Sequence, residues 1–419
     1  IQSTMIKKIF IAACLLFSLV SLAQQGTSSP YSYYGIGDIR YRGMLENRSM
    51  GGVAIEQDSI HVNVENPSSY ANLKLTTLTM GGTYGTKALK DDANSATAKR
   101  TTLDYMVVAI PVGKLGVGFG LMPYSSVGYK IQSISADGSQ NNRRLEGTGG
   151  VNKVFFGSGY KLTKNFSIGA DVQYNFGKIE TDNLEYVTGV PVGTREVNVA
   201  YLSGLNFNLG AMYQAKISKK INLYSSLNYT FKGKLTSENT RTISTVDYDG
   251  TFDIDPEGFD EVTTTRELEL PSKVTLGFGF GQSRKWLIGT EIAIRDAGKL
   301  ANNYNNVSGA SFKKYNRYSV GGYYIPDYNS FTSYAKRIVY RAGLRYEKTG
   351  LVIQNQEIDD KSVTLGFGLP SVGSFSNFNI GLEYGIKGTT AAGLIQENYF
   401  NASVSFSLND KWFVKRKFY

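Results

Sequence analysis

His61 is the single histidine of the chain, and Ser59 precedes it by two residues. A serine hydroxyl that is activated by a histidine and oriented by a carboxylate is the arrangement of a serine hydrolase. No motif pairs these two residues, and the simpler interpretation of His61 is a polar side chain of the N-terminal region. A zinc site needs clustered histidines and cysteines, and the chain has one of each. We therefore expect no enzyme, no catalytic residue, no cofactor and no metal site.

Six carboxylates lie close together in a polar stretch over residues 236–271. Calcium prefers oxygen ligands, but the spacing does not match the loop of an EF-hand. A solvated extracellular loop is the better interpretation of this stretch. The six residues are Asp247, Asp249, Asp253, Asp255, Glu257 and Asp260.

A second set of charged residues falls on the polar faces of segments that alternate between apolar and polar residues. Arginine side chains among them could select a solute or hold a carboxylate, because the guanidinium fork matches that group. The alternative, which we favour, is a ladder of charges that fills a polar interior and fixes an N-terminal segment there. The set consists of Asp171, Glu291, Arg295, Arg341, Arg345, Glu383 and Lys387.

A strict alternation of apolar and polar residues marks the strands that must position these charges. Between Phe166 and Phe176 the apolar residues share one face and the polar residues share the other, as in a β-strand. Ten steps of about 3.3 Å, tilted by about 40°, rise roughly 25 Å, which is the height of the apolar band of an outer-membrane barrel. We therefore expect the apolar faces to point outward into lipid.

The same alternation recurs fourteen times along the chain. Short turns and long polar loops separate the segments in turn, which is typical of a barrel with periplasmic turns and extracellular loops. An even number of strands lets the sheet close without an unpaired edge. The sequence thus predicts an all-β fold, a 14-stranded antiparallel transmembrane β-barrel with an N-terminal lumenal plug. The predicted strands are 75–86, 101–112, 115–124, 151–163, 166–180, 201–217, 220–235, 272–282, 285–297, 312–326, 336–348, 361–369, 376–388 and 397–409.

Residues 1–23 predict a secretory signal peptide. Lys7 and Lys8 precede an apolar run, and Ser21-Leu22-Ala23 ends in a small residue that suits cleavage. Cys14 lies within that run, so we interpret it as part of the removed peptide and not as a lipid attachment site. The mature chain would then contain no cysteine and form no disulfide.

The mature chain would be basic. Without Lys7 and Lys8 it has 43 Lys and Arg residues against 35 Asp and Glu residues, a net charge of +8. No basic stripe with interleaved aromatic residues is present, so we expect no nucleic acid as a partner. Contact with anionic lipids of the outer membrane is the preferred explanation. No stretch after residue 23 is long and apolar enough for a membrane helix, and the mean hydropathy is −0.22.

Residues 24–74 precede the first predicted strand and form the predicted plug, and residues 75–419 form the predicted barrel. This N-terminal segment is apolar and rich in glycine, unlike a disordered tail. It contains Tyr31-Ser-Tyr-Tyr-Gly-Ile-Gly37, Ser49-Met-Gly-Gly-Val-Ala-Ile55 and Glu65-Asn-Pro-Ser-Ser-Tyr-Ala-Asn72. Because it lacks a long strand, we expect it to fold compactly inside the lumen.

The chain resembles the long-chain fatty acid transporter (FadL) family of outer-membrane proteins, in particular its Bacteroidetes relatives. The resemblance rests on the Ser49–Ile55 segment, on Asn66-Pro67 with Asp58 shortly before it, and on fourteen strands behind an N-terminal plug. The family's Asn-Pro-Ala motif of the plug reads Asn66, Pro67 and Ser68 here, a change that keeps the residue small.

The resemblance implies that a hydrophobic molecule diffuses from an outer cleft into the lumen and leaves sideways through a kink in the third strand. Here that strand carries Gly116, Gly118 and Gly120 and ends at Met122 and Pro123. Proline cannot donate a hydrogen bond to a neighbouring strand, so it can open a gap in the wall. The alternative is that Pro123 only ends the strand.

The sequence leaves two functions open. The first is an outer-membrane channel for passive uptake of hydrophobic compounds such as fatty acids, with a hydrophobic ligand as its partner. The second is a non-enzymatic barrel subunit or scaffold of an envelope protein complex, in secretion or barrel-assembly machinery, with protein partners. PorV-like relatives of the same fold serve in secretion, so the fold alone does not choose between them.

Overall fold

The structure is a computed structural model that describes residues 26–39, 43–135, 141–247, 260–297, 309–371 and 375–411. The predicted signal peptide, residues 1–23, lies outside the described residues, as do residues 248–259 of the carboxylate-rich stretch 236–271. The prediction of a loop over the rest of that stretch is wrong, because Gly233–Asp247 and Asp260–Leu270 form strands that pair with each other. Among the described residues no helix is long and apolar enough to cross a membrane.

Eighteen strands form the wall, and a nineteenth, β1 (Asp38–Ile39), belongs to the N-terminal segment. The wall strands are β2 (Thr76–Lys90), β3 (Ser95–Val112), β4 (Leu115–Pro123), β5 (Ser125–Ser133), β6 (Asn142–Lys161), β7 (Phe166–Tyr186), β8 (Val192–Lys216), β9 (Asn222–Thr230), β10 (Gly233–Asp247), β11 (Asp260–Leu270), β12 (Lys273–Gln282), β13 (Trp286–Arg295), β14 (Ala310–Phe312), β15 (Tyr315–Tyr324), β16 (Val339–Ile353), β17 (Gln356–Pro370), β18 (Asn377–Lys387) and β19 (Gln396–Asp410). The short helices are η1 (Pro30–Tyr33), α2 (Leu45–Arg48), η2 (Pro67–Asn72), η3 (Ala335–Arg337) and η4 (Ala391–Gly393).

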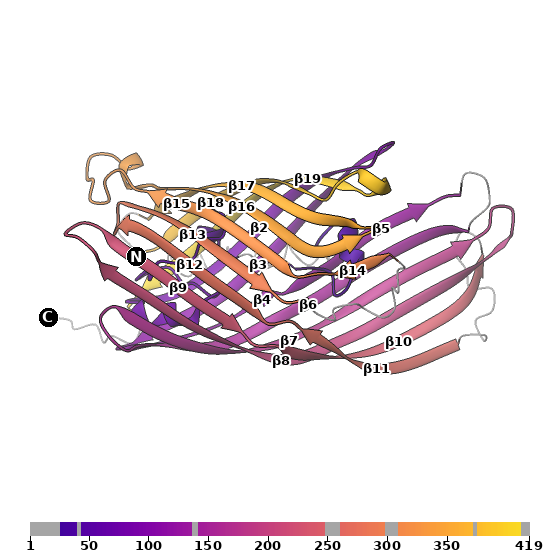
Figure 1. Cartoon of the computed structure of the whole chain (residues 1–419), viewed down its shortest axis with the longest axis horizontal. Coiled ribbons are helices and arrows are strands. Elements are labelled where there is room, and N and C mark those ends of the chain that lie inside the picture. Colours follow the sequence, from indigo (N-terminus) through magenta and orange to yellow (C-terminus); the bar gives the residue numbers. More distant parts are fainter. Residues whose placement is uncertain are drawn as a thin grey trace, which may run out of the picture.

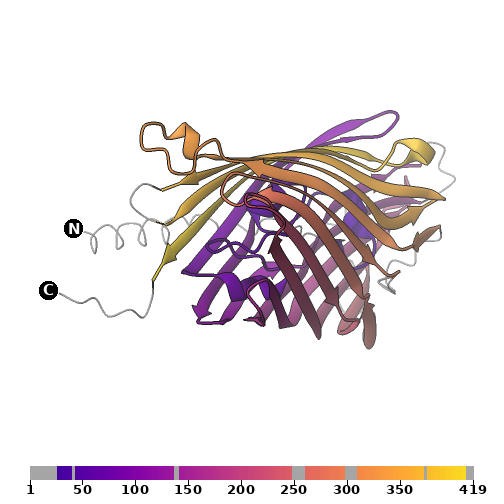
Figure 2. The same ribbon diagram turned by 60° about the vertical axis from the view of Figure 1, so that its left-hand side comes forward.

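The wall closes into one barrel because β19 pairs with β2 along its whole length, from Gln396 opposite Lys90 to Asp410 opposite Thr76. Four spans are divided into two strands each, namely β4–β5, β9–β10, β11–β12 and β14–β15. The barrel therefore has 14 antiparallel spans, and the predicted all-β, 14-stranded antiparallel barrel is confirmed, whereas the N-terminal plug stays a prediction. Figures 1 and 2 show the tilted strands wrapped around the N-terminal segment.

The two faces of the wall differ as the alternation predicts. In β7, Ile168 and Tyr174 are exposed on the outside, whereas Ser167, Asp171 and Asn175 are buried on the inside. Large apolar residues recur on the outer face of the other strands, for example Phe207 and Leu276. An outer surface of this kind is costly in water and suits contact with lipid.

The two ends of the barrel differ in length and in their connections. At one end, which we call the turn end, the strands are joined by short turns such as Gly113-Lys114 and Ser283–Lys285. The longest connection at the turn end, residues 325–338, contains η3. At the other end, the loop end, β5, β6, β7, β8, β10 and β11 extend beyond the rest of the wall (Figure 1). Turns face the periplasm in barrels of this class.

The described residues of the N-terminal segment, 26–39 and 43–74, pack against the inward faces of the wall. Helix η2 contacts β4, β6, β7 and β8, and α2 contacts β17, β18 and β19. Glycines in the wall leave the space for this approach. A Cβ atom at Gly343 would lie 2.1 Å from the carbonyl carbon of Met50, and one at Gly169 would lie 2.4 Å from the backbone nitrogen of Ser68. The segment is therefore fitted to the wall at the level of the backbone.

Candidate functional site

The wall pairing is interrupted beside the span that was predicted to open sideways. β3 pairs with β4 only from Met106 to Val112, and its remaining residues pair with β2 alone. After Pro123 the chain continues as β5, which pairs with β6 and with β1 of the N-terminal segment. Within the described residues, β5 therefore does not continue the pairing between β4 and β3.

Two glycines of β6, the strand that pairs with both β4 and β5, allow the backbone to bend at this break. Gly149 and Gly150 have positive φ angles of 105° and 147°, which side chains with a Cβ rarely adopt. A Cβ atom at Gly150 would lie 2.4 Å from the carbonyl oxygen of Ser125. The backbone nitrogen of Tyr124 donates to the carbonyl oxygen of Val151 at 2.7 Å, so the span bends without losing β6.

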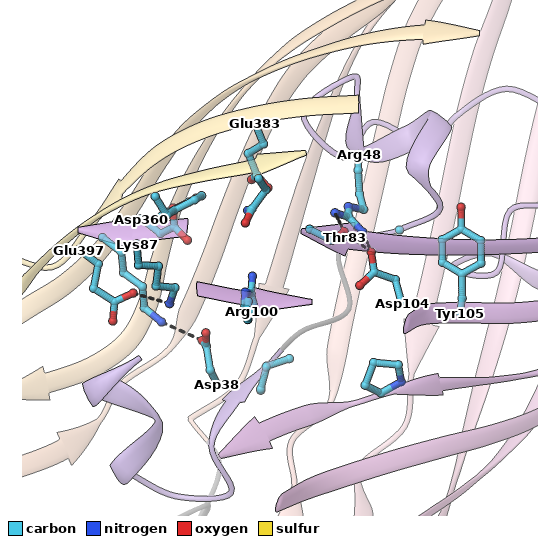
Figure 3. Close-up of a pocket in the computed structure, with 16 residues that line it drawn as sticks. Asp38, Arg48, Thr83, Lys87, Arg100, Asp104, Tyr105, Asp360, Glu383 and Glu397 are labelled. Carbon is cyan, nitrogen blue, oxygen red and sulfur yellow. Dashed lines mark hydrogen bonds and ion pairs between the residues drawn. The ribbon is translucent and has the colours of Figure 1, made fainter. Parts of the chain in front are cut away.

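A cavity of about 60 Å³ lies at the break and is lined mainly by charged residues (Figure 3). Lys87 Nζ lies 2.6 Å from Glu397 Oε2, and Arg48 Nη1 lies 2.5 Å from Asp104 Oδ2. Lys387 Nζ lies 2.8 Å from Asp38 Oδ1 in β1. The surroundings of the break thus suit ions and polar groups, not a hydrocarbon.

The predicted opening residues lie on the inner face of β4 and at its end. Gly116 and Gly118 face Tyr70 of η2, and a Cβ atom at Gly116 would lie 1.9 Å from the Tyr70 carbonyl oxygen. Gly120 faces Val107 and Phe155, while Met122 is buried and Pro123 lines the charged cavity. These glycines accommodate the N-terminal segment. An opening at this place stays a prediction.

The predicted plug motif ties the N-terminal segment to two strands. Asn66 caps η2 by accepting a hydrogen bond from the backbone nitrogen of Ser68, and Pro67 begins the helix. The Asn66 amide also donates to the carbonyl oxygens of Ala211 in β8 and Leu227 in β9, at 3.2 and 3.0 Å. Asn66 therefore joins the cap of η2 to the barrel wall.

The predicted lumenal charges all lie on the inner side of the wall, and Glu291 and Lys387 bind described residues of the N-terminal segment directly. Glu291 accepts from the backbone nitrogen of Ala54 at 3.1 Å, and Lys387 pairs with Asp38. The others bind neighbours within the wall. Asp171 accepts from Gln173 and Asn208, Arg295 stacks over Tyr315, Arg341 donates to Asn379, and Arg345 pairs with Glu383.

Sequence reasoning missed the partners that complete this arrangement. Arg317 Nη2 lies 2.5 Å from Glu291 Oε1 and 3.6 Å from Glu65 Oε2. Glu65 also lies 3.4 Å from Lys273 Nζ. We call Glu65, Lys273, Glu291 and Arg317 the lumenal charge cluster. Arg317 stands at a polar position of the predicted strand 312–326, and this position could have identified it as a lumenal charge. Glu65 lies in a segment without periodicity, so the sequence gives no such signal for it.

A larger cavity, of about 1010 Å³, opens at the turn end below the N-terminal segment. His61 Nδ1 lies 2.5 Å from Asp58 Oδ2 there. Burial raises the pKa of Asp58, but the charge and hydrogen bond of His61 outweigh burial and lower it to about 2. Burial lowers the pKa of His61, but Asp58 outweighs it and raises that pKa. Within the described residues His61 forms hydrogen bonds with Asp58 and Asn377 and none with Ser59, so the geometry offers no serine nucleophile activated by histidine.

Glu56 lies in the same cavity and accepts a hydrogen bond from the Tyr323 hydroxyl at 3.0 Å. Burial and the nearby Asp58 carboxylate raise the pKa of Glu56 to about 7. Within the described residues, no three His, Cys, Asp or Glu side chains are grouped in a way that could hold a metal ion.

The sequence matches the BamG family over residues 5–419. The chain belongs to the BamG family. No curated protein sequence matches it. The family match covers the N-terminal segment as well as every strand, so both parts of the fold are features of the family.

Solved structures with the same fold include hydrocarbon channels and transporters of low sequence identity. The toluene transporter TodX of Pseudomonas putida is 16% identical, with 89% of this chain and 99% of that chain covered and a TM-score of 0.57. A FadL homologue of Pseudomonas aeruginosa is 13% identical, with 88% and 99% covered and a TM-score of 0.57. The monoaromatic hydrocarbon channel CymD is 14% identical, with 90% and 99% covered and a TM-score of 0.55. These likenesses establish a FadL-like fold.

Proposed function

We propose that this chain is a non-enzymatic outer-membrane barrel that serves as a subunit of an envelope protein complex, and that its N-terminal segment acts as a fixed plug. The observation that carries the proposal is the close fit of the segment to wall glycines such as Gly116, Gly169 and Gly343. A segment in backbone contact with the wall cannot move aside without disrupting several strands at once. The Bam prefix of the family name favours barrel-assembly machinery as the complex.

The charges around the lumen support the same proposal. The cavity at the strand break is lined by Arg48, Lys87, Asp104 and Glu397, and Glu65, Lys273 and Arg317 of the lumenal charge cluster line a second cavity. A hydrophobic solute that displaced water from these groups would leave charges without their solvent, at a cost of several kcal/mol or more. The geometry thus favours a barrel that holds its interior closed.

The test is purification of the protein from native outer membranes in a mild detergent. An affinity tag at Gly189 would leave the fold intact, since a Cβ atom there meets no other atom within 4 Å. We expect a stoichiometric protein partner that persists through size-exclusion chromatography. The proposal would be overturned if the chain were recovered as a monomer that carries lipid but no other protein.

A second candidate function is a channel for hydrophobic compounds such as fatty acids. Two observations favour it, namely the interrupted pairing at Pro123 and the FadL-like fold shared with TodX and CymD. Proteoliposomes that contain the purified chain would be loaded with labelled oleate or toluene from outside. Uptake above that of empty liposomes that is abolished by Gly118→Leu would establish the channel and would contradict a closed lumen.

A further inference from the structure

The cavity at the turn end is surrounded by cations. Its lining includes exposed lysines from three different turns or strand ends, Lys164, Lys216 and Lys411, together with Lys74 at the end of the N-terminal segment. We call this cavity and its cations the basic vestibule. The full set of lining cations is Lys74, Lys161, Lys164, Lys216, Arg284, Arg337, Arg341 and Lys411.

Most of these cations lack a carboxylate partner. Within the described part of the chain, Lys74, Lys164 and Lys216 form no ion pair. Arg284 stacks over Tyr328, with its Cζ 4.9 Å from the ring centroid, and Arg337 stacks over Tyr334 at 5.2 Å. Stacking on an aromatic ring leaves the positive charge uncompensated. Further exposed lysines lie on the same rim, namely Lys114, Lys219, Lys220, Lys285 and Lys336.

The carboxylates that line the vestibule, Glu46, Glu56 and Asp58, are three against eight lysines and arginines and so do not neutralise it. Asp58 binds His61, Glu56 accepts from Tyr323, and Glu46 accepts from Asn379 at 2.9 Å. At the rim itself, Asp327 accepts a hydrogen bond from the backbone nitrogen of Asn329, and Asp410 accepts one from that of Lys411. The vestibule therefore presents a surplus of positive charge around a concave mouth.

We propose that the basic vestibule binds an acidic segment of a periplasmic protein partner, an inference that rests on the proposed function as a complex subunit. A cavity of about 1010 Å³ reaches the size of the larger ligand sites in proteins, typically about 300–1,000 Å³. Charge complementarity between such a surface and its partner raises the association rate and excludes wrong partners. The turn end faces the periplasm, so the partner must be reached from that side.

The position of the cations favours a polypeptide over lipid headgroups. Lys164, Lys216 and Arg284 line a cavity inside the mouth of the barrel. Headgroups of the inner leaflet would lie around the outer circumference of the wall, where aromatic and apolar side chains face outward. A flexible acidic chain can enter the mouth from the periplasm, whereas a phospholipid would have to leave the bilayer.

The experiment measures binding of a fluorescent twelve-residue peptide of alternating glutamate and serine to the full mature chain in detergent micelles. The test variant is Lys164→Glu with Lys216→Glu. The matched control is Lys90→Glu with Lys99→Glu, which changes the net charge equally at exposed loop-end lysines that form no ion pair among the described residues. All four side chains are exposed, so both variants should fold, and a heat-dependent shift on a gel verifies it.

We expect the vestibule variant to weaken peptide binding on the order of 10- to 100-fold at low salt, and the control by about twofold or less. Equal weakening by both variants would overturn the inference, because net charge alone would then explain binding. Displacement of the peptide by nanodiscs of phosphatidylglycerol, but not of phosphatidylcholine, would overturn it in favour of headgroups. If the native complex forms but no peptide binds, this inference fails alone. If the chain is recovered without any partner, the proposed function fails.

Discussion

Cations in the lumenal charge cluster meet carboxylates, whereas cations in the basic vestibule do not. Arg317 lies between Glu291 and Glu65, and all three side chains are buried. Lys164 and Lys216, in contrast, are exposed and form no ion pair within the described residues. A buried charge without a partner costs several kcal/mol, so pairing inside the barrel is obligatory, whereas solvated cations at the mouth need none.

The loop end extends this comparison, because several of its cations are paired with carboxylates across neighbouring strands, although exposed lysines such as Lys90 and Lys99 form no ion pair within the described residues. Arg195 binds Asp182, and Arg241 binds Glu196. Water would tolerate unpaired cations at both ends, so solvation alone does not explain why lysines and arginines outnumber carboxylates in the lining of the vestibule. The difference indicates that the positive charge of the vestibule is available to another molecule.

The largest expected effect comes from breaking the lumenal charge cluster. Arg317→Met would leave Glu291 and Glu65 buried without the guanidinium, and we expect a loss of about 3–5 kcal/mol in unfolding free energy. Urea titration of the barrel in detergent measures this loss. Adding Glu291→Leu to Arg317→Met should restore part of the stability. No restoration would mean that Arg317 acts through packing and not through its charge.

The fit of the N-terminal segment to the wall predicts the next effect. Gly343→Ala would place a Cβ atom 2.1 Å from the carbonyl carbon of Met50, so wall or segment must shift, at a cost of about 1–3 kcal/mol. Gly82→Ala is the matched control, since its Cβ atom would lie 3.1 Å from its nearest neighbour among the described residues, the Thr102 carbonyl oxygen. Trypsin cleavage of the N-terminal segment should accelerate in Gly343→Ala only.

The titratable groups of the vestibule predict a dependence on pH. The pKa of Glu56 is raised from 4.5 to about 7, so the folded state binds more protons than the unfolded state over that range. The contribution of Glu56 to stability is therefore complete below pH 4.5 and is lost as pH rises through 7. His61, whose pKa is also raised, acts with the same sign: its contribution is complete below pH 6.5 and is lost as pH rises through its folded pKa.

Asp58 acts with the opposite sign and at a different pH. Its pKa is lowered to about 2, so its contribution is present above 3.8 and is lost only as pH falls towards 2. Between pH 5 and 8, hydrogen exchange at residues 56–61 should accelerate more than the intrinsic rate. Glu56 faces Tyr323, Tyr224 and Arg341 as well as Asp58 and His61. Glu56→Gln should flatten the dependence, and an unchanged profile would assign it to other groups.

The smallest effects compare single cations at the two ends. Arg195→Ala should lower the free energy of unfolding by about 0.2–1 kcal/mol, because the Arg195 guanidinium binds the Asp182 carboxylate. Lys216→Ala should cause no measurable loss, since Lys216 has no carboxylate to release and lies near Lys219 and Lys220 in sequence. Thermal unfolding of both variants in one detergent tests the pair. A larger loss for Lys216→Ala would show that the vestibule cations stabilise the fold.

The barrel was predictable because each strand carries its own signal. Strands such as β7 and β18 alternate strictly between apolar and polar residues. Because lipid lies outside the wall and polar groups lie inside it, only one register places every residue of such a strand on its proper face. The divisions at Pro123 and Pro271 were harder to predict, because a bend in a span depends on the neighbouring strand. Pro123 was a local signal for the break, but Gly149 and Gly150 of β6, which provide the bend opposite Ser125, could not be placed there from the sequence.

The site was predictable only in part. The inward positions of Glu291, Arg341 and Arg345 follow from period two, but their partners come from segments far away in sequence. Glu65 lies in a segment without periodicity, so its contact with Arg317 had no sequence signal. The basic vestibule gathers lysines from separate turns, each of which looks like an ordinary solvated turn when taken alone.

The most direct test of the account is the composition of the complex purified from native outer membranes that carry the wild type, Lys164→Glu with Lys216→Glu, or Lys90→Glu with Lys99→Glu. Quantitative mass spectrometry gives the ratio of each partner to the barrel. We predict a stoichiometric partner in the wild type and the loop-end variant, and its loss in the vestibule variant. A wild-type chain that is recovered without a protein partner and takes up labelled oleate in proteoliposomes would contradict the account.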